Sequence, residues 1–188
     1  RRFEQRPTET LVIGQMLGPV GLGVVLRSRS YLDRSVPLWL DEADWAVSLL
    51  TRPLSEHLIR PIGFMAISKL LATTFGPSET WLRALSWFAG VATTVLSPFL
   101  ARRLYRSAGS QLLFVAVIAL HPAAIDLSKE FKPYAASLAT HLAMLFVVLR
   151  YDATRRARDL AVAVVVVALG VLMAQDAIFA YPALFLVL

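Results

Sequence analysis

The 188-residue chain contains no cysteine, which excludes both a disulfide framework and a thiolate metal site from this stretch of sequence. Charged residues are also scarce, at 17%, whereas hydrophobic residues make up 57% and the mean hydropathy is +0.61. Soluble globular domains carry about 25% charged residues. The composition therefore predicts an integral membrane protein and excludes an ordinary soluble domain.

Several catalytic motifs are missing as well. The sequence has no Walker loop, no HExxH and no GxSxG, so nothing supports a nucleotide hydrolase, a zinc peptidase or a serine hydrolase. The net charge of +6 does not indicate nucleic acid, because the arginines cluster at the ends of apolar segments instead of forming one basic face. We interpret them as topology signals and phosphate ligands, with no nucleic-acid partner.

Apolar stretches close to the minimum length for crossing a bilayer dominate what is present. They are 11–26, 81–100, 111–127, 135–149, 160–174 and a last one that begins near 178. We expect an all-α fold, a polytopic transmembrane helical bundle. The segment 160–188 is either one helix or two helices that turn at Gln175 and Asp176, and the cost of a mid-membrane Asp176 favours the turn. We expect the chain to be part of a longer protein.

The segment 61–75 decides the topology. If it crosses the membrane, the arginines near 102–106 and 155–158 face the side opposite to the N-terminal arginines, against the positive-inside bias. If it is a juxtamembrane or re-entrant helix, all three clusters share one side. We therefore expect residues 27–80 to form one long outer loop with juxtamembrane helices, on the same side as 128–134.

Asp41 and Glu42 are the candidate catalytic carboxylates, in the run Trp39-Leu40-Asp41-Glu42. One interpretation is structural, with Asp41 as the cap of a helix that carries Asp44 in its first turn. The other is a general base, since partial desolvation beside apolar and aromatic residues raises the basicity of a carboxylate. The two are compatible, because a capped helix end is a rigid mount for a base.

The segment 128–134 is a second polar group, with alternating charges between two apolar stretches. It is typical of an interfacial belt, with Tyr134 at the membrane boundary. The functional alternative gives Lys129 and Lys132 a lipid phosphate, and Glu130 an orienting or metal-ligating role.

Basic residues of the long loop form a third group, in which Arg60 is a candidate ligand for the lipid phosphate. Arg83 starts an apolar segment and is either a site residue or the partner of Glu79, four residues earlier. His57 is a weaker candidate for orienting an acceptor or joining a metal site, since it has no spaced partner. The cofactor is left open, a divalent metal being one option.

Five segments in order resemble the N-terminal half of the bacterial protein-mannosyltransferase-like, or aminoarabinose-transferase-like, GT-C glycosyltransferases. They are Trp39-Leu40-Asp41-Glu42-Ala43, Arg60-Pro61, the segment 75–86, the segment 100–104 and the segment 128–134. The similarity spans about residues 10–188. It departs from the family pattern at Ile62, where many members have a second proline, and at Lys129, where they have glutamine.

The resemblance implies an integral enzyme of the bacterial cytoplasmic membrane with its site on the outer, periplasmic or extracellular, face. It would move a sugar from a polyprenyl-phosphate donor to a hydroxyl of a glycan, lipid or protein acceptor by one inverting displacement. Asp41 would be the base, while Lys132 and Arg83 would stabilise the leaving phosphate. Membrane lipids are further expected partners. The alternative is a non-enzymatic membrane protein, a lipid-carrier transporter or an assembly subunit.

Overall fold

A computed structural model describes residues 6–33, 37–57 and 59–180 of the chain, and within these ranges it is all-helical, as expected. The helices follow one another in the order α1 (Arg6–Leu32), α2 (Leu40–Thr51), η1 (Leu54–Glu56), α3 (Ile62–Phe75), α4 (Glu79–Leu104), α5 (Ala108–Leu120), α6 (Pro122–Asp126), α7 (Tyr134–Thr154), α8 (Ala157–Met173) and η2 (Gln175–Ala180). The protein is an all-α membrane bundle in which α4 packs against α1, α3, α5 and α7.

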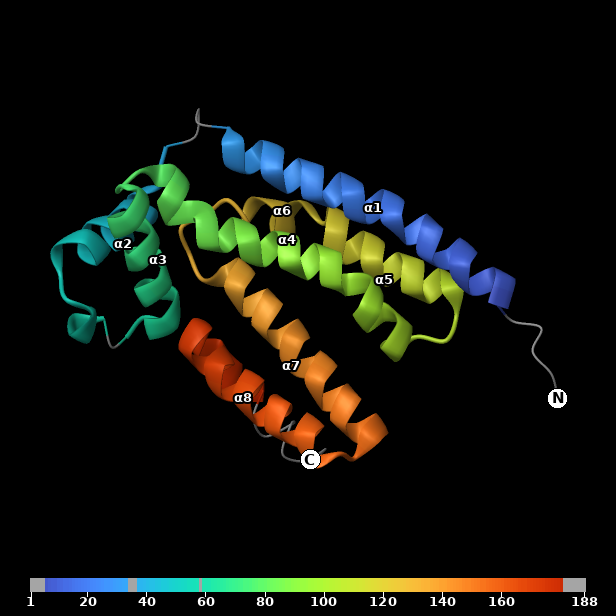
Figure 1. The fold of residues 1–188 in the computed structure, drawn as a ribbon. Helices are drawn as coiled ribbons and strands as arrows, with labels where there is room; N and C mark the ends of the chain where they lie inside the picture. Colours follow the sequence, from blue (N-terminus) through green and yellow to red (C-terminus); the bar gives the residue numbers. More distant parts are fainter. Residues whose placement is uncertain (1–5, 34–36, 58, 181–188) are drawn as a thin grey trace.

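The long helices run back and forth along the molecule (Figure 1). The C-terminal end of α1, the N-terminal ends of α4 and α7, and the C-terminal end of α8 lie at one end, together with α2 and α3. We call it the α2 end. The connections α4–α5 and α7–α8 lie at the opposite end, with Arg102, Arg103 and Arg106 and with Arg155, Arg156 and Arg158. We call it the arginine end.

Two of the described helices, α4 and α7, are long and apolar enough to cross a membrane, and α3 and α5 are shorter apolar helices. α4 contains Pro98, which has no N–H to donate to the Thr94 carbonyl. The Ser97 hydroxyl donates to that carbonyl instead, at 2.8 Å. A proline is thus accommodated inside an apolar helix without leaving a buried backbone group unsatisfied.

Proline also shapes the apolar run 111–127. α5 ends at Leu120, and the short α6 begins at Pro122, whose ring suits the first position of a helix. The end of α5 is fixed from another helix: Arg27 of α1 is buried and donates to the carbonyls of Ala119 at 2.6 Å and Ile118 at 2.9 Å. A cation here also opposes the negative end of the α5 dipole.

Near its C-terminal boundary the described chain leaves α8 after Met173 and forms η2. Asp176 lies in η2, where its carboxylate accepts a hydrogen bond from Ser137 of α7 at 2.5 Å. This aspartate is therefore exposed and hydrogen-bonded outside the long helices. The apolar stretch expected from 178 onward lies mostly outside the described residues.

A buried aromatic cluster connects the segments that meet at the α2 end. Phe131, from the loop between α6 and α7, stacks on Phe64 of α3 at 5.8 Å between ring centroids and meets Trp45 of α2 edge-on at 6.5 Å. Leu49 and Leu82 belong to the same cluster. Burial of these side chains fixes α2 and α3 against the 128–134 loop, which places the charged residues of all three segments next to one another.

Candidate functional site

The first turn of α2 carries the acidic residues. The helix begins at Leu40, and Trp39 is its N-terminal cap, so the expectation that Asp41 caps the helix was wrong. Glu42 performs the capping interaction instead, because its Oε2 accepts the Trp39 backbone N–H at 3.0 Å. The Asp41 side chain is left exposed, and Asp44 follows it three residues later on the same face.

Asp41 forms an ion pair with Lys132 across the site, with 2.6 Å between Oδ2 and Nζ. The partners differ in environment: 74% of the Asp41 side chain is exposed, but only 6% of Lys132. The Lys132 ammonium also lies 4.2 Å from the centroid of the Trp45 ring, a cation–π distance. A buried cation therefore lies beside a carboxylate that is exposed to solvent.

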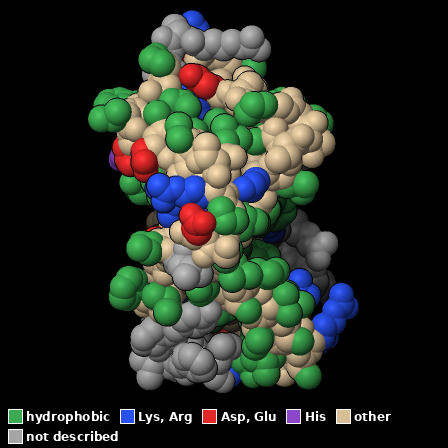
Figure 2. Space-filling model, turned by 90° about the vertical axis from the view of Figure 1, so that its left-hand side faces the viewer, with side chains coloured by type: hydrophobic (Ala, Val, Ile, Leu, Met, Phe, Trp, Pro, Cys, Tyr) green, Lys and Arg blue, Asp and Glu red, His purple; other side chains and the backbone are tan. Residues whose placement is uncertain are grey.

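A second pair lies beside the first. Arg60 donates to Asp44 at 2.9 Å, and its guanidinium carbon lies 4.6 Å from the Trp45 ring centroid. Trp45 thus contacts both cations, and each cation is paired with an exposed aspartate. Figure 2 views the α2 end, where acidic and basic side chains lie side by side near the middle of the face. We call Asp41, Asp44, Trp45, Arg60 and Lys132 the charged site.

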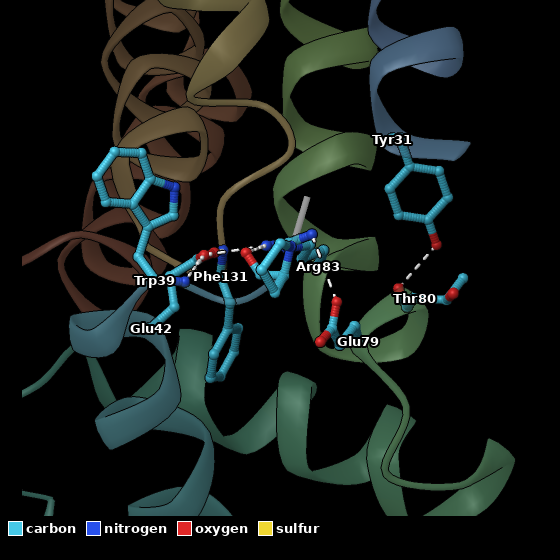
Figure 3. A network of polar contacts seen from close by, with 8 residues as sticks. Tyr31, Trp39, Glu42, Glu79, Thr80, Arg83 and Phe131 are labelled. Atoms are coloured by element: carbon cyan, nitrogen blue, oxygen red, sulfur yellow. Dashed lines mark hydrogen bonds and ion pairs between the residues drawn. The ribbon is translucent and has the colours of Figure 1, made fainter. Parts of the chain in front are cut away.

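Beneath the charged site lies a buried network centred on Glu42, shown in Figure 3. Only 2% of Glu42 is exposed. Besides the Trp39 N–H, its carboxylate accepts the backbone N–H of Phe131 and an N–H of Arg83 at 3.0 Å. Such a carboxylate has no exposed oxygen to offer a substrate. Its contacts join α2, α4 and the 128–134 loop.

Arg83 is enclosed by protein groups, with 6% of the residue exposed. In addition to Glu42 it donates to the Pro37 carbonyl at 3.2 Å, and it lies 3.8 Å from the Glu79 carboxylate. Of the two sequence interpretations, the pairing with Glu79 is present but weak, and the close partner is Glu42. These contacts point to a positioning role for Arg83.

The backbone beside Lys132 is held from two directions. Glu42 accepts the N–H of Phe131, and the buried Ser86 hydroxyl of α4 donates to the Lys132 carbonyl at 2.9 Å. Since both anchors are buried, the loop cannot shift without losing hydrogen bonds in a low-dielectric interior. The Lys132 ammonium is therefore set in place against Asp41 by α2 and α4.

His57 is buried, with 3% exposed, and its Nε2 has no hydrogen-bond partner among the described residues. Burial lowers the pKa of His57, and the nearby charges of Arg60, Lys69 and Arg52 lower it further. The ring is thus disposed to be neutral. A neutral imidazole beside three cations avoids adding a fourth charge to this side of the site.

Two further residues expected at the site, Lys129 and Tyr134, lie apart from it. Lys129 pairs with Asp126 at 3.0 Å, and Tyr134 is half exposed at the start of α7, where it lines a cavity with Arg27. Glu130 is partly buried, and burial raises its pKa, helped by the charges of Glu42 and Asp126. In the described part of the chain, no three His, Asp or Glu side chains are grouped to hold a metal ion.

Two members of the charged site were not among the residues expected there, Trp45 and Asp44. Their spacing from Asp41 was a usable signal, because residues three and four apart share one face of a helix. The contacts of Trp45 with Arg60 and Lys132 had no such signal. They arise from segments far apart in the sequence.

One comparison with known proteins is informative. The family model described as dolichyl-phosphate-mannose-protein mannosyltransferase matches residues 59–188. This region includes Arg60, Arg83 and Lys132, whereas α2 with Asp41 precedes it. Searches of curated proteins and of solved structures give no match.

Proposed function

The chain belongs to the dolichyl-phosphate-mannose-protein mannosyltransferase family, which consists of membrane glycosyltransferases of the GT-C type, and from this premise we propose a specific reaction. The protein transfers a sugar from a polyprenyl-phosphate donor to an acceptor hydroxyl, with inversion at the anomeric carbon. The reaction takes place at the α2 end, on the outer face of the membrane.

The observation that carries the proposal is the pairing of an exposed carboxylate with a buried cation, Asp41 with Lys132 at 2.6 Å. A glycosyl transfer from a lipid phosphate needs a base for the acceptor and a positive charge for the departing phosphate. Here the two groups form an ion pair with each other. They sit on elements that the Glu42 network holds rigid, as such chemistry requires.

In the proposed step the acceptor oxygen forms a bond to the anomeric carbon while the bond from that carbon to the phosphate oxygen breaks. The acceptor proton moves to Asp41. The electron pair of the broken bond stays on the phosphate, which leaves as polyprenyl phosphate with one more negative charge. Lys132, aided by Arg60, stabilises that charge where it develops. Asp41 and the phosphate thus compete for Lys132 before the reaction.

Within this proposal the remaining residues have secondary roles. Glu42 and Arg83 position the base and Lys132, instead of touching the reacting atoms, because both are buried in mutual contact. His57 and Glu130 border the site as supporting residues. Lys129 and Tyr134 lie outside it.

The test compares Asp41→Asn with Asp44→Asn, two aspartates on one face of α2 that are each paired with a cation. Both proteins are placed in vesicles with a panel of polyprenyl-phosphate sugars. We expect Asp41→Asn to lose 10²-fold to 10⁴-fold in transfer, the usual contribution of a general base. Asp44→Asn should stay within about tenfold of the unchanged protein.

Donor binding separates the base from a merely structural aspartate. Loss of the Asp41 charge leaves Lys132 without that counter-ion, so the donor should bind about two- to fivefold more tightly to Asp41→Asn. Near-normal transfer by this variant would sink the base assignment. An unchanged protein that binds and moves lipid-linked sugars without transferring any sugar would favour a transporter.

A further inference from the structure

A groove lies between α4 and α7, well away from the charged site. It encloses about 350 Å³ and is lined by side chains of α4 between Ala92 and Leu100 and of α7 between Ala139 and Val147. The two helices run in the same direction (Figure 1), so the groove follows their length. Alanines at 92, 139 and 143 leave space that larger side chains would fill.

The groove presents no hydrogen-bonding group to an occupant. Its two buried hydroxyls belong to Thr93 and Ser97, and each donates to a carbonyl of α4 itself, Ala89 at 2.8 Å and Thr94 at 2.8 Å. The remaining lining consists of alanine, leucine, valine and phenylalanine. A hydrocarbon chain fits such a surface, whereas a sugar or a peptide backbone would lose hydrogen bonds in it.

The mouth of the groove is cationic. A second hollow of about 320 Å³, lined by Phe99, Arg102, Arg103 and Phe146, shares its two phenylalanines with the groove. Both arginines are exposed, and the Arg103 guanidinium carbon lies 4.7 Å from the Phe146 ring centroid. That contact directs a guanidinium toward the place where the apolar lining ends.

From this continuity we infer that the α4–α7 groove binds one anionic phospholipid, with an acyl chain against Ala139 and Ala143 and its phosphate at Arg102 and Arg103. Arginine matches phosphate through paired N–H donors, and anionic headgroups are attracted to basic residues at a membrane surface. The site lies at the arginine end. It is therefore separate from the donor phosphate proposed at Lys132, and it binds a lipid that is not consumed.

Charge complementarity selects this occupant. A further apolar helix would fill the groove without using the two arginines at its mouth, and a zwitterionic lipid would gain less from them because its headgroup is neutral overall. An anionic phospholipid contacts both the apolar lining of the groove and the two arginines at its mouth. Removing the arginines and filling the groove should therefore both weaken the binding of the same lipid.

Lipid retention is measured by native mass spectrometry on the full-length protein, released from vesicles of equal parts phosphatidylglycerol and phosphatidylcholine. We expect preferential retention of phosphatidylglycerol. The double variant Arg102→Gln with Arg103→Gln should lower that retention about 30-fold, from two contacts at about fivefold each. Arg106→Gln is the matched control, because it removes a charge at the same end but outside the groove, and it should change retention less than twofold.

The groove itself is tested by Ala143→Phe, which fills it from α7 and should reduce retention of both lipids. Equal retention of the two lipids, or equal effects of the Arg102/Arg103 and Arg106 variants, would overturn the inference. So would unchanged retention of phosphatidylglycerol by Ala143→Phe.

Discussion

At the scale of single residues, the charged site separates two adjacent carboxylates by environment. Asp41 is exposed and Glu42 is buried, although both lie in the first turn of α2. Glu42 points inward to Arg83 and to the 128–134 loop. The outer residue is therefore free to meet a substrate, while the inner one holds the architecture.

Removal of the Glu42 charge should destabilise the fold more than it affects the chemistry directly. Glu42→Gln leaves Arg83 buried without its close counter-ion. Breaking a buried ion pair in this way lowers the free energy of unfolding by about 3–5 kcal/mol. The measurement is the free energy of unfolding by urea in detergent. Glu79→Gln is the control, because the Glu79 carboxylate is half exposed and lies 3.8 Å from the Arg83 guanidinium. This substitution should cost under about 1 kcal/mol.

A double variant makes the same prediction sharper. Glu42→Gln combined with Arg83→Met removes both charges, so it should recover part of the stability lost in the single variant. Additive losses in the double variant would contradict a direct interaction between the two side chains.

His57 should make stability depend on pH. Its folded pKa is lowered by burial and by nearby cations, so the unfolded chain binds the proton more readily than the folded protein does. Stability is then fully present above the unfolded pKa of about 6.5 and is lost as pH falls through that value toward the folded pKa. The melting temperature in detergent should fall between pH 7.5 and pH 5.5.

His57→Gln supplies the control for this pH effect, since glutamine does not titrate. Its melting temperature should fall less over the same range. Glu130 does not mimic the effect: its pKa is raised, so its contribution is lost as pH rises, the opposite direction. An identical pH profile for the variant and the unchanged protein would rule out His57 as the source.

At the scale of elements, helix contacts depend on glycine at a few close approaches. An added Cβ at Gly63 of α3 would lie 2.8 Å from the Leu172 carbonyl oxygen of α8, and one at Gly23 of α1 would lie 2.6 Å from the Ala119 carbonyl oxygen of α5. Backbone atoms on the facing helix cannot move aside as a flexible side chain can. These glycines set how closely the helices pack.

We therefore expect Gly63→Ala to destabilise the protein by about 1–3 kcal/mol, the usual cost of overpacking. It should also weaken transfer, because α3 carries the cluster that supports the charged site. Gly14→Ala in α1 is the matched control, since an added Cβ there meets nothing within 4 Å. The control should be neutral or slightly stabilising, because alanine is the better helix former. Equal melting temperatures for the two variants would refute the close approach.

At the scale of the whole molecule, the ends of the bundle differ in charge. Both short arginine clusters of the described chain lie at the arginine end, and the charged site lies at the other. Basic clusters of this kind remain on the cytoplasmic side of a membrane. The charged site should consequently face outward.

Single cysteines test that orientation in the cysteine-free stretch. Ser78→Cys lies at the α2 end and Gly109→Cys at the arginine end, and both positions are exposed. An impermeant maleimide added to whole cells should label Cys at 78 directly, and Cys at 109 only after the membrane is permeabilised. The reverse order of labelling would place the charged site on the cytoplasmic face and contradict the proposed orientation.

Composition and hydropathy were enough to predict the helical membrane bundle, because burial in lipid forces long apolar helices whatever their packing. The adjacent carboxylates and the resemblance of five ordered segments likewise identified the family and pointed to Asp41. These signals are local, so they can be read along the chain without knowledge of the fold.

Only the tertiary structure showed which charges meet. Asp41 and Lys132 are 91 positions apart in the sequence, and Glu42 and Arg83 are 41 positions apart, so neither pairing follows from helix periodicity. The packing of Phe131 against Phe64 and Trp45 brings these segments together. Contact between distant segments depends on how side chains of several helices fill a shared core, and for that reason the roles of Glu42, Arg83 and Trp45 emerged only in three dimensions.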